Sequence, residues 1–138
     1  MIQGEPDSSR TWDAFHAFMR GELSSEEYAQ LFDPGVEVRW NEPAYPDTPQ
    51  ELHGREDFIA FAEQYRDGWE DLTAEILETT EIPGHRILEL VRQSGRGRQS
   101  GAPIVIHFFQ LSTLKDGKLT RIEYYRHRVD AMRAAGLA

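Results

Sequence analysis

The second half of the chain consists of four successive segments in which apolar and polar residues alternate. The segments cover residues 72–82, 86–98, 102–113 and 119–128. A period of two is typical of strands that bury one face, and short Gly- or Pro-containing connections join strands that are antiparallel neighbours. Pro83 with Gly84, and Asp116 with Gly117, stand at two of these connections. The pattern predicts a four-stranded antiparallel meander.

The first half of the chain has mainly helical periodicity instead. Apolar residues at helical spacing predict helices that begin near Trp12, at the capping-box sequence Ser24 to Glu27, and at Gly54. Pro34 and Gly35 are expected to end the second helix after Phe32. A strand over 36–40, a Pro-rich loop over 41–53 and a short helix over 130–135 complete the chain. Helices followed by a sheet predict an α+β fold with the helices on one side of a curved sheet.

Composition limits the class of protein further. The 138 residues carry a net charge of −9, which disfavours a nucleic-acid partner, and the absence of cysteine excludes disulfides and thiolate chemistry. There is no apolar run long enough for a membrane span and no signal-peptide pattern, so we expect a cytoplasmic protein without a membrane partner. One domain over 1–138, with a flexible tail over 1–9, fits this length.

The last hairpin allows a prediction of strand register. If residues 115–117 form a three-residue loop, Gln110 lies opposite Ile122 and Phe108 lies opposite Tyr124. Both faces of the hairpin then carry large apolar side chains. Because the helices cover only one face, we expect the outer face of the sheet to form a homodimer.

The order of elements and several local phrases resemble a known family. The phrases include LFDPGVEVRW at 31–40, HGREDF at 53–58 and TLKDGK at 113–118. Together they resemble SnoaL-like proteins of the nuclear transport factor 2-like superfamily, which includes ketosteroid isomerases and polyketide cyclases. The resemblance implies a cone-shaped α+β barrel in which a strongly curved antiparallel sheet wraps around three helices, with a short C-terminal helix. It also implies a deep apolar pocket and no cofactor.

Large apolar side chains are available to line such a pocket. We expect an apolar or polycyclic small molecule to contact Trp40, Phe58, Phe61, Tyr65, Trp69, Ile106, Phe108 and Ile122. The same residues are also suitable for an ordinary core, so the pattern alone leaves both interpretations open.

Five polar residues are candidates for chemistry in the pocket. Glu42, desolvated against Trp40, is a possible general base, and His16 is a second one. Tyr124, Gln110 and Arg126 are candidates to orient oxygen atoms of a substrate. These five do not match the Asp-Arg-Asp set of limonene epoxide hydrolase, since Tyr124 stands where its final-strand Asp would be.

Metal and phosphate sites are not indicated. The five histidines lack metal-ligand spacing, and the Gly- and Arg-rich segment 94–101 joins two strands, which predicts a mobile hairpin tip. Two functions remain open: a cofactor-independent isomerase, cyclase or hydrolase that acts by proton transfer, or a small-molecule binding or carrier protein without catalysis.

Overall fold

A computed structural model describes residues 9–42 and 48–137. In chain order, the helices and strands are α1 (Ser9–Met19), α2 (Ser25–Ala29), β1 (Phe32–Trp40), β2 (Glu51–His53), α3 (Arg55–Asp67), β3 (Trp69–Ile82), β4 (Arg86–Gly97), β5 (Pro103–Lys115), β6 (Lys118–Tyr125) and α4 (Arg128–Ala135). The expected tail at 1–9 lies outside the described residues except for Ser9, which begins α1.

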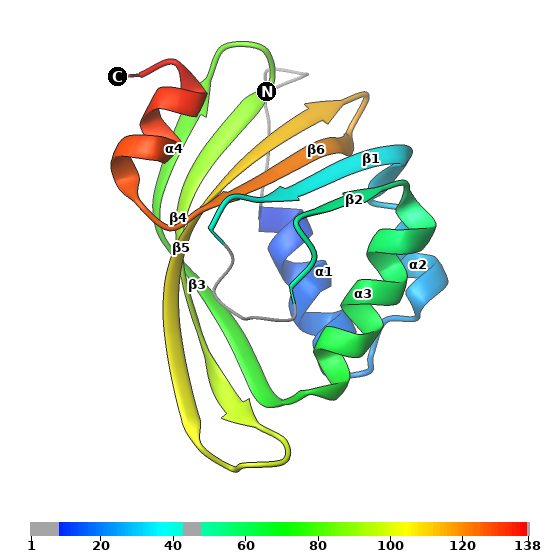
Figure 1. The fold of residues 1–138 in the computed structure, drawn as a ribbon. Helices are drawn as coiled ribbons and strands as arrows, with labels where there is room; N and C mark the ends of the chain where they lie inside the picture. The colour runs from blue at the N-terminus through cyan, green and yellow to red at the C-terminus, as the bar shows by residue number, and fades with distance from the viewer. Residues whose placement is uncertain (1–8, 43–47, 138) are drawn as a thin grey trace.

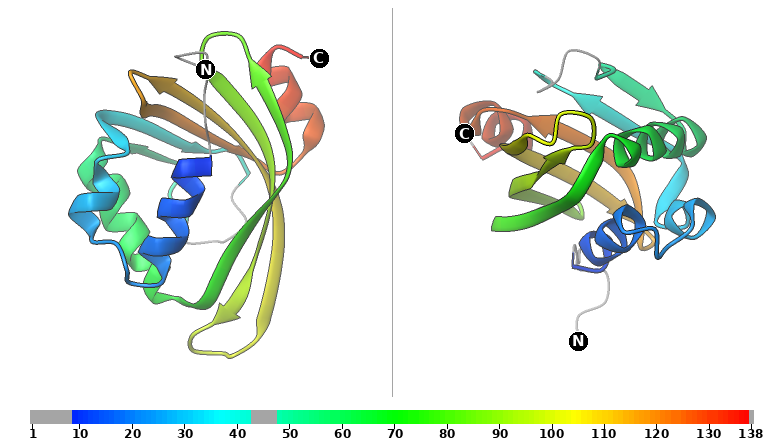
Figure 2. Two further views of the ribbon diagram at one scale, coloured as in Figure 1. Left: turned by 180° about the vertical axis from the view of Figure 1, so that it is seen from behind. Right: turned by 90° about the horizontal axis from the view of Figure 1, so that it is seen from below.

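The strands form one strongly curved six-stranded sheet with the order β2-β1-β6-β5-β4-β3 (Figure 1). Strands β3 to β6 are the predicted antiparallel meander. The sheet is mixed, however, because β1 runs parallel to β6. Helices α1, α2 and α3 lie in the concave side of the sheet and α4 lies on the outer side (Figure 2). The predicted α+β cone is confirmed.

The second helix is shorter than predicted. Its capping box is present, because Ser24 Oγ accepts from Glu27 N–H and the Glu27 carboxylate accepts from Ser24 N–H, but the helix ends at Ala29. Phe32 belongs to β1, and Pro34 lies in an irregular part of the β1 and β6 pairing. Proline is tolerated at such a bulge because no ladder hydrogen bond is needed there.

The Pro-rich segment 41–53 is not all loop. Its last three residues form β2, in which Leu52 pairs with Val38 of β1. The prediction failed because β2 is a short edge strand with little apolar pattern of its own.

The register predicted for the last hairpin is wrong by two residues. Asp116 and Gly117 both have positive φ and form a two-residue turn, so that Lys115 pairs with Lys118. A bulge at Thr120 then shifts the pairing, and Gln110 lies opposite Tyr124 rather than Ile122. A shift of two preserves which side chains share a face. From the bulge toward the far end of the hairpin, even-numbered residues of both strands therefore still point into the cone, whereas Leu119 on the turn side joins the inner cluster.

Two apolar clusters pack on opposite sides of the sheet. The inner cluster joins α1, α2 and α3 to β1 and β6 around Phe18, Phe32 and Phe58. The outer cluster packs Ala131 and Ala135 of α4 against outward-facing residues such as Leu111. A helix of the same chain thus covers part of the face that was assigned to a dimer contact.

The segment 94–101 is anchored at its base rather than free. Arg98 donates from Nε to the Asp67 carbonyl at 2.9 Å and from Nη2 to the Trp69 carbonyl at 2.8 Å. Gly95 is in tight contact with Trp69, since a Cβ there would lie 3.0 Å from the Trp69 ring. Trp69 itself begins β3 and does not continue the aromatic face of α3.

Candidate functional site

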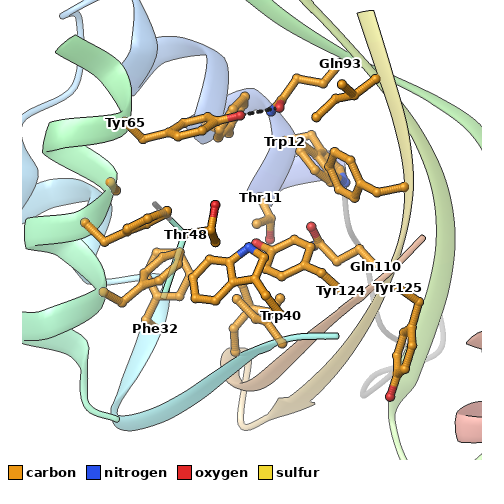
Figure 3. A pocket seen from close by; sticks show the side chains of 18 of the residues that line it. Thr11, Trp12, Phe32, Trp40, Thr48, Tyr65, Gln93, Gln110, Tyr124 and Tyr125 are labelled. Carbon is orange, nitrogen blue, oxygen red and sulfur yellow. Dashed lines mark hydrogen bonds between the residues drawn. The ribbon is translucent and has the colours of Figure 1, made fainter. Parts of the chain in front are cut away.

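A cavity of about 130 Å³ lies between the helices and the concave face of the sheet (Figure 3). Its described lining residues are Thr11, Trp12, Phe15, Met19, Tyr28, Phe32, Trp40, Asn41, Glu42, Thr48, Phe58, Phe61, Ala62, Tyr65, Gln93, Ile106, Phe108, Gln110, Leu119, Ile122, Tyr124, Tyr125 and Arg126. Among these residues only Glu42 and Arg126 carry a charge, and both are exposed. The interior is therefore neutral and mostly apolar.

Stacked rings form one wall of the cavity. Trp40 of β1 stacks on Tyr124 of β6, with ring centroids 5.2 Å apart and an angle of 16° between the planes. The Trp40 ring also contacts the ring of Phe61 of α3, with the two centroids 4.9 Å apart. Aromatic pairs of this kind contribute about 0.5–1.5 kcal/mol each beyond their burial. The rings thus hold α3 against the sheet and leave flat apolar surface toward the cavity.

Seven of the eight expected ligand-contacting residues line the cavity, and Trp69 does not. Trp69 is buried behind Tyr65, with the two ring centroids 5.7 Å apart, and it packs against Gly95. It is a core residue because the chain turns from α3 into β3 at Gly68, which takes the next side chain off the helical face.

Two buried glutamines supply polar groups to the cavity. Tyr65 Oη donates to Gln93 Oε1 at 2.6 Å, and Gln110 Nε2 donates to Ser112 Oγ at 3.1 Å. Gln93 and Gln110 are 5% and 6% exposed. Gln110 was expected in the site, whereas Gln93 was missed. Gln93 shares its strand face with Val91, but β4 carries apolar residues on both faces, so the sequence does not show which face is inside.

Glu42 lies at the mouth of the cavity. Its Oε2 lies 3.1 Å from His127 Nε2, and its side chain is 56% exposed. The desolvation expected against Trp40 is therefore absent. Arg126 also lines this mouth from an exposed position.

His16 does not line the cavity. Its Nε2 accepts a hydrogen bond from the Ala74 backbone N–H of β3 at 2.9 Å, which ties α1 to the sheet. A nitrogen held in this way is not available as a base, so the expectation for His16 is corrected to a structural role.

A buried carboxyl group escaped the sequence analysis. Glu89 of β4 is 1% exposed, and Trp12 Nε1 of α1 donates to both of its oxygens, at 3.2 and 3.1 Å. Glu89 pairs with Gln110 across the β4 and β5 ladder. Trp12 lies between Glu89 and the cavity as part of the wall, so Glu89 positions Trp12 rather than lining the cavity itself.

Asn41 combines a bonded and an unbonded amide atom at the end of β1. Its Oδ1 accepts from Arg39 Nε at 3.1 Å, and its buried Nδ2 has no hydrogen-bond partner among residues 9–42 and 48–137. Buried polar atoms in folded proteins are rarely left unpaired. The residue type gave no signal for this in the sequence.

Burial raises the pKa of three tyrosines. The pKa values of Tyr28 and Tyr124 are well above the ordinary value, and burial together with the Glu123 carboxylate raises the pKa of Tyr125 to about 12. These three phenols therefore stay protonated in the folded chain at a pH near 10, which is the ordinary pKa of a tyrosine side chain.

We expect the stability of the protein to decrease in alkaline solution. As the pH rises from about 10 to about 12, the unfolded chain loses phenol protons that the folded chain keeps, so the free energy of unfolding falls. Urea unfolding at successive pH values measures the slope. Replacing Tyr28 with Phe should flatten it, and an unchanged slope in this variant would contradict the assignment.

Residues 9–42 and 48–137 contain no group of three or more His, Asp or Glu side chains placed to hold a metal ion. Within the same residues, no helix has the length and apolar character that crossing a membrane requires.

Comparisons with known proteins agree with this architecture. A model of the SnoaL-like domain matches residues 11–122. A search of curated protein sequences found no match. Among solved structures, a putative SnoaL-like polyketide cyclase from Jannaschia sp. CCS1 is 20% identical, with a TM-score of 0.68 over 94% of this chain and 88% of that one.

Two further structures were solved with small molecules. A hypothetical protein with a ketosteroid isomerase-like fold from Catenulispora acidiphila DSM 44928, in complex with trimethylamine, is 13% identical, with a TM-score of 0.68 over 96% of both chains. TerC, co-crystallized with polyporic acid, is 18% identical, with a TM-score of 0.65 over 88% of this chain and 91% of that one. At these identities the similarity establishes the fold.

Proposed function

Because the chain belongs to the SnoaL-like domain family, we propose that it binds one small apolar molecule inside the cone. The observation that carries this proposal is the neutral, ring-lined cavity of about 130 Å³. An apolar cavity of about 150 Å³ is large enough for benzene. By this comparison the best ligand is about one ring in size, which is smaller than the polycyclic molecule that the family resemblance suggests.

The similar structures support a ligand in this place without identifying it. One of them holds trimethylamine and another was crystallized with polyporic acid, so cones of this shape accept small molecules of different chemistry. The lining residues that the structure describes disfavour a charged ligand in the interior, because among them the charged side chains, Glu42 and Arg126, lie at the mouth.

Calorimetric titration with ethylbenzene tests the proposal. We expect the protein to bind ethylbenzene and the Ile106→Trp variant to lose that binding, because the larger side chain fills the cavity that Ile106 lines. Val105 follows Ile104 on the same strand but is 59% exposed on the outer face, so Val105→Trp is the matched control and should bind normally. Absence of ethylbenzene binding in the unmodified protein would overturn the proposal.

Proton transfer is a second candidate function, favoured by the position of Glu42. Its carboxylate lies at the cavity mouth, where it can reach a ligand proton, and the Tyr124 phenol lies inside. Arg126 and Gln110 are then the groups that orient ligand oxygens. If the protein is an enzyme, Glu42→Gln and Tyr124→Phe should lower the rate far more than the affinity. Effects on affinity alone would leave binding without catalysis as the function.

The homodimer also stays a proposal. Helix α4 leaves the outer face of β3, β4 and β5 open around Val105, and a second copy of the chain could cover that part. Native mass spectrometry at micromolar concentration is expected to give twice the 15.9 kDa chain mass. A monomer would refute it. The expected cytoplasmic location likewise remains a prediction.

A further inference from the structure

Each of the two cavity glutamines has one amide atom that is hydrogen-bonded to a neighbouring side chain. The bonded atom is the oxygen in Gln93 and the nitrogen in Gln110, so the remaining atom differs between the two. The Tyr65 hydroxyl occupies the oxygen of Gln93, and in the described part of the chain its Nε2 has no protein partner. Ser112 occupies the nitrogen of Gln110, and the Gln110 Oε1 has no protein partner there. Gln93 therefore offers a donor and Gln110 an acceptor.

These two groups lie at separate places on the concave face. Gln93 is opposite Ile106, and Ile106 is four positions before Gln110 on β5. Four residues of strand span about 13 Å. Figure 3 shows Gln93 beside Tyr65 and Gln110 beside Tyr124, on the sheet side of the cavity.

The side chain between the two glutamines is apolar. Phe108 lies midway on β5, opposite Val91, and its ring meets the Tyr124 ring edge-on at 5.6 Å. A ligand that joins the two glutamines thus needs an apolar, flat middle. Both glutamines are more than nine-tenths buried, so an unmatched polar atom at either place would lose its hydrogen bond to water.

The geometry points to a neutral para-substituted ring with an acceptor at one end and a hydroxyl at the other as the ligand class of this cavity. Side chains stand roughly perpendicular to a strand and converge on a concave face. If the two amide atoms are as far apart as their positions along the sheet, hydrogen bonds of about 3 Å at each end leave about 7 Å between the ligand's polar atoms. A para-substituted benzene ring has about this span. The ligand's carbonyl accepts from Gln93 Nε2 and its hydroxyl donates to Gln110 Oε1.

This inference rests on the proposed function. Four probe molecules of similar shape test the ligand class separately from small-molecule binding itself. Ethylbenzene has no polar atom, acetophenone adds the acceptor, 4-ethylphenol adds the hydroxyl, and 4-hydroxyacetophenone has both. We expect each matched hydrogen bond to raise the affinity by about three- to tenfold, so that 4-hydroxyacetophenone binds most tightly. This comparison needs only the unmodified protein.

Variants then assign each end of the ligand. Gln93→Leu should remove the advantage of acetophenone over ethylbenzene and leave the advantage of 4-ethylphenol, and Gln110→Leu should do the reverse. Tyr65→Phe keeps Gln93 but removes the hydroxyl that holds the Gln93 amide oxygen. If Tyr65 positions Gln93, this variant should have a weaker preference for acetophenone over ethylbenzene. Circular dichroism and thermal unfolding of each variant confirm that it is folded.

The outcomes separate the two proposals. If ethylbenzene does not bind, the proposed function fails. If ethylbenzene binds and the three polar probes bind no more tightly, the cavity is a binding site and the assignment of the glutamines is wrong. If Gln93→Leu affects 4-ethylphenol instead, the direction of the ligand is overturned.

Discussion

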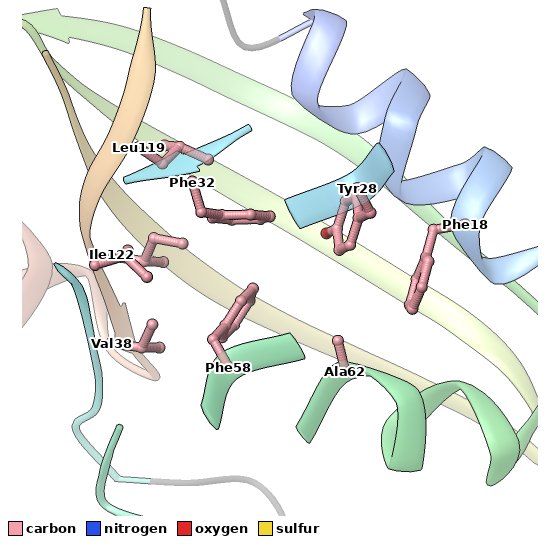
Figure 4. Close-up of a cluster of buried hydrophobic side chains, with 9 residues drawn as sticks. Phe18, Tyr28, Phe32, Val38, Phe58, Ala62, Leu119 and Ile122 are labelled. Atoms are coloured by element: carbon pink, nitrogen blue, oxygen red, sulfur yellow. The ribbon is translucent and has the colours of Figure 1, made fainter. Parts of the chain in front are cut away.

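Replacing Phe32 with alanine is expected to lower the free energy of unfolding by about 3–5 kcal/mol, as for other large aromatic residues in well-packed cores. Phe32 is 1% exposed at the start of β1. Its ring centroid lies 5.1 Å from that of Tyr28 on α2 and 4.8 Å from that of Phe58 on α3. Figure 4 shows the ring between these two helices, so its loss opens the junction of α2, α3 and the sheet.

Urea unfolding of Phe32→Ala and Phe32→Leu measures this effect. Leucine keeps most of the volume and should cost less than about 1.5 kcal/mol. Val105→Ala, on an exposed residue, should change the stability by less than about 0.5 kcal/mol. Equal stability of Phe32→Ala and Val105→Ala would show that Phe32 is not part of the packed core.

Replacing Trp12 with phenylalanine is expected to lower the free energy of unfolding by about 1.5–3 kcal/mol. A smaller phenyl ring replaces the indole, and the Glu89 carboxyl group loses the indole N–H that donates to both of its oxygens. Because Glu89 is 1% exposed, water does not replace that donor without rearrangement.

A double-mutant cycle isolates the hydrogen bond. Glu89→Leu leaves the indole N–H of Trp12 without this acceptor, and the double variant Trp12→Phe, Glu89→Leu removes both polar partners at once. The double variant should therefore lose less stability than the sum of the two single variants. Strict additivity in urea unfolding would mean that the pair contributes no coupling energy.

Much of the fold could be predicted from the sequence because its determinants are local. The alternation after Trp69 is enough to indicate the meander, and Ser24 with Glu27 is enough to place the start of α2. Phe32 was assigned to the wrong element because a short apolar run near Pro34 fits either a helix end or a strand start. Its pairing with Leu119 across the sheet decides the matter, and that contact is not local.

The candidate site was predictable in part for the same reason. Beyond the bulge, the even-numbered side chains such as Gln110 and Tyr124 were placed correctly because a register error of two keeps a side chain on its face, whereas Leu119 near the turn was placed on the wrong face. The surroundings of His16 and Glu42 differ from those expected because they depend on partners distant in sequence, Ala74 for His16 and His127 for Glu42.

The sequence by itself determined the α+β class and the meander, since periodicity and turn chemistry act over a few residues, and it indicated only part of the aromatic lining of the cone. Only the tertiary structure decided that β1 joins β6 in parallel, that α4 covers part of the outer face, and that Gln93 and Glu89 point inward. Both faces of β4 carry apolar residues, so the direction of its polar side chains depends on which helices pack against each face. That choice is made by contacts across the whole chain.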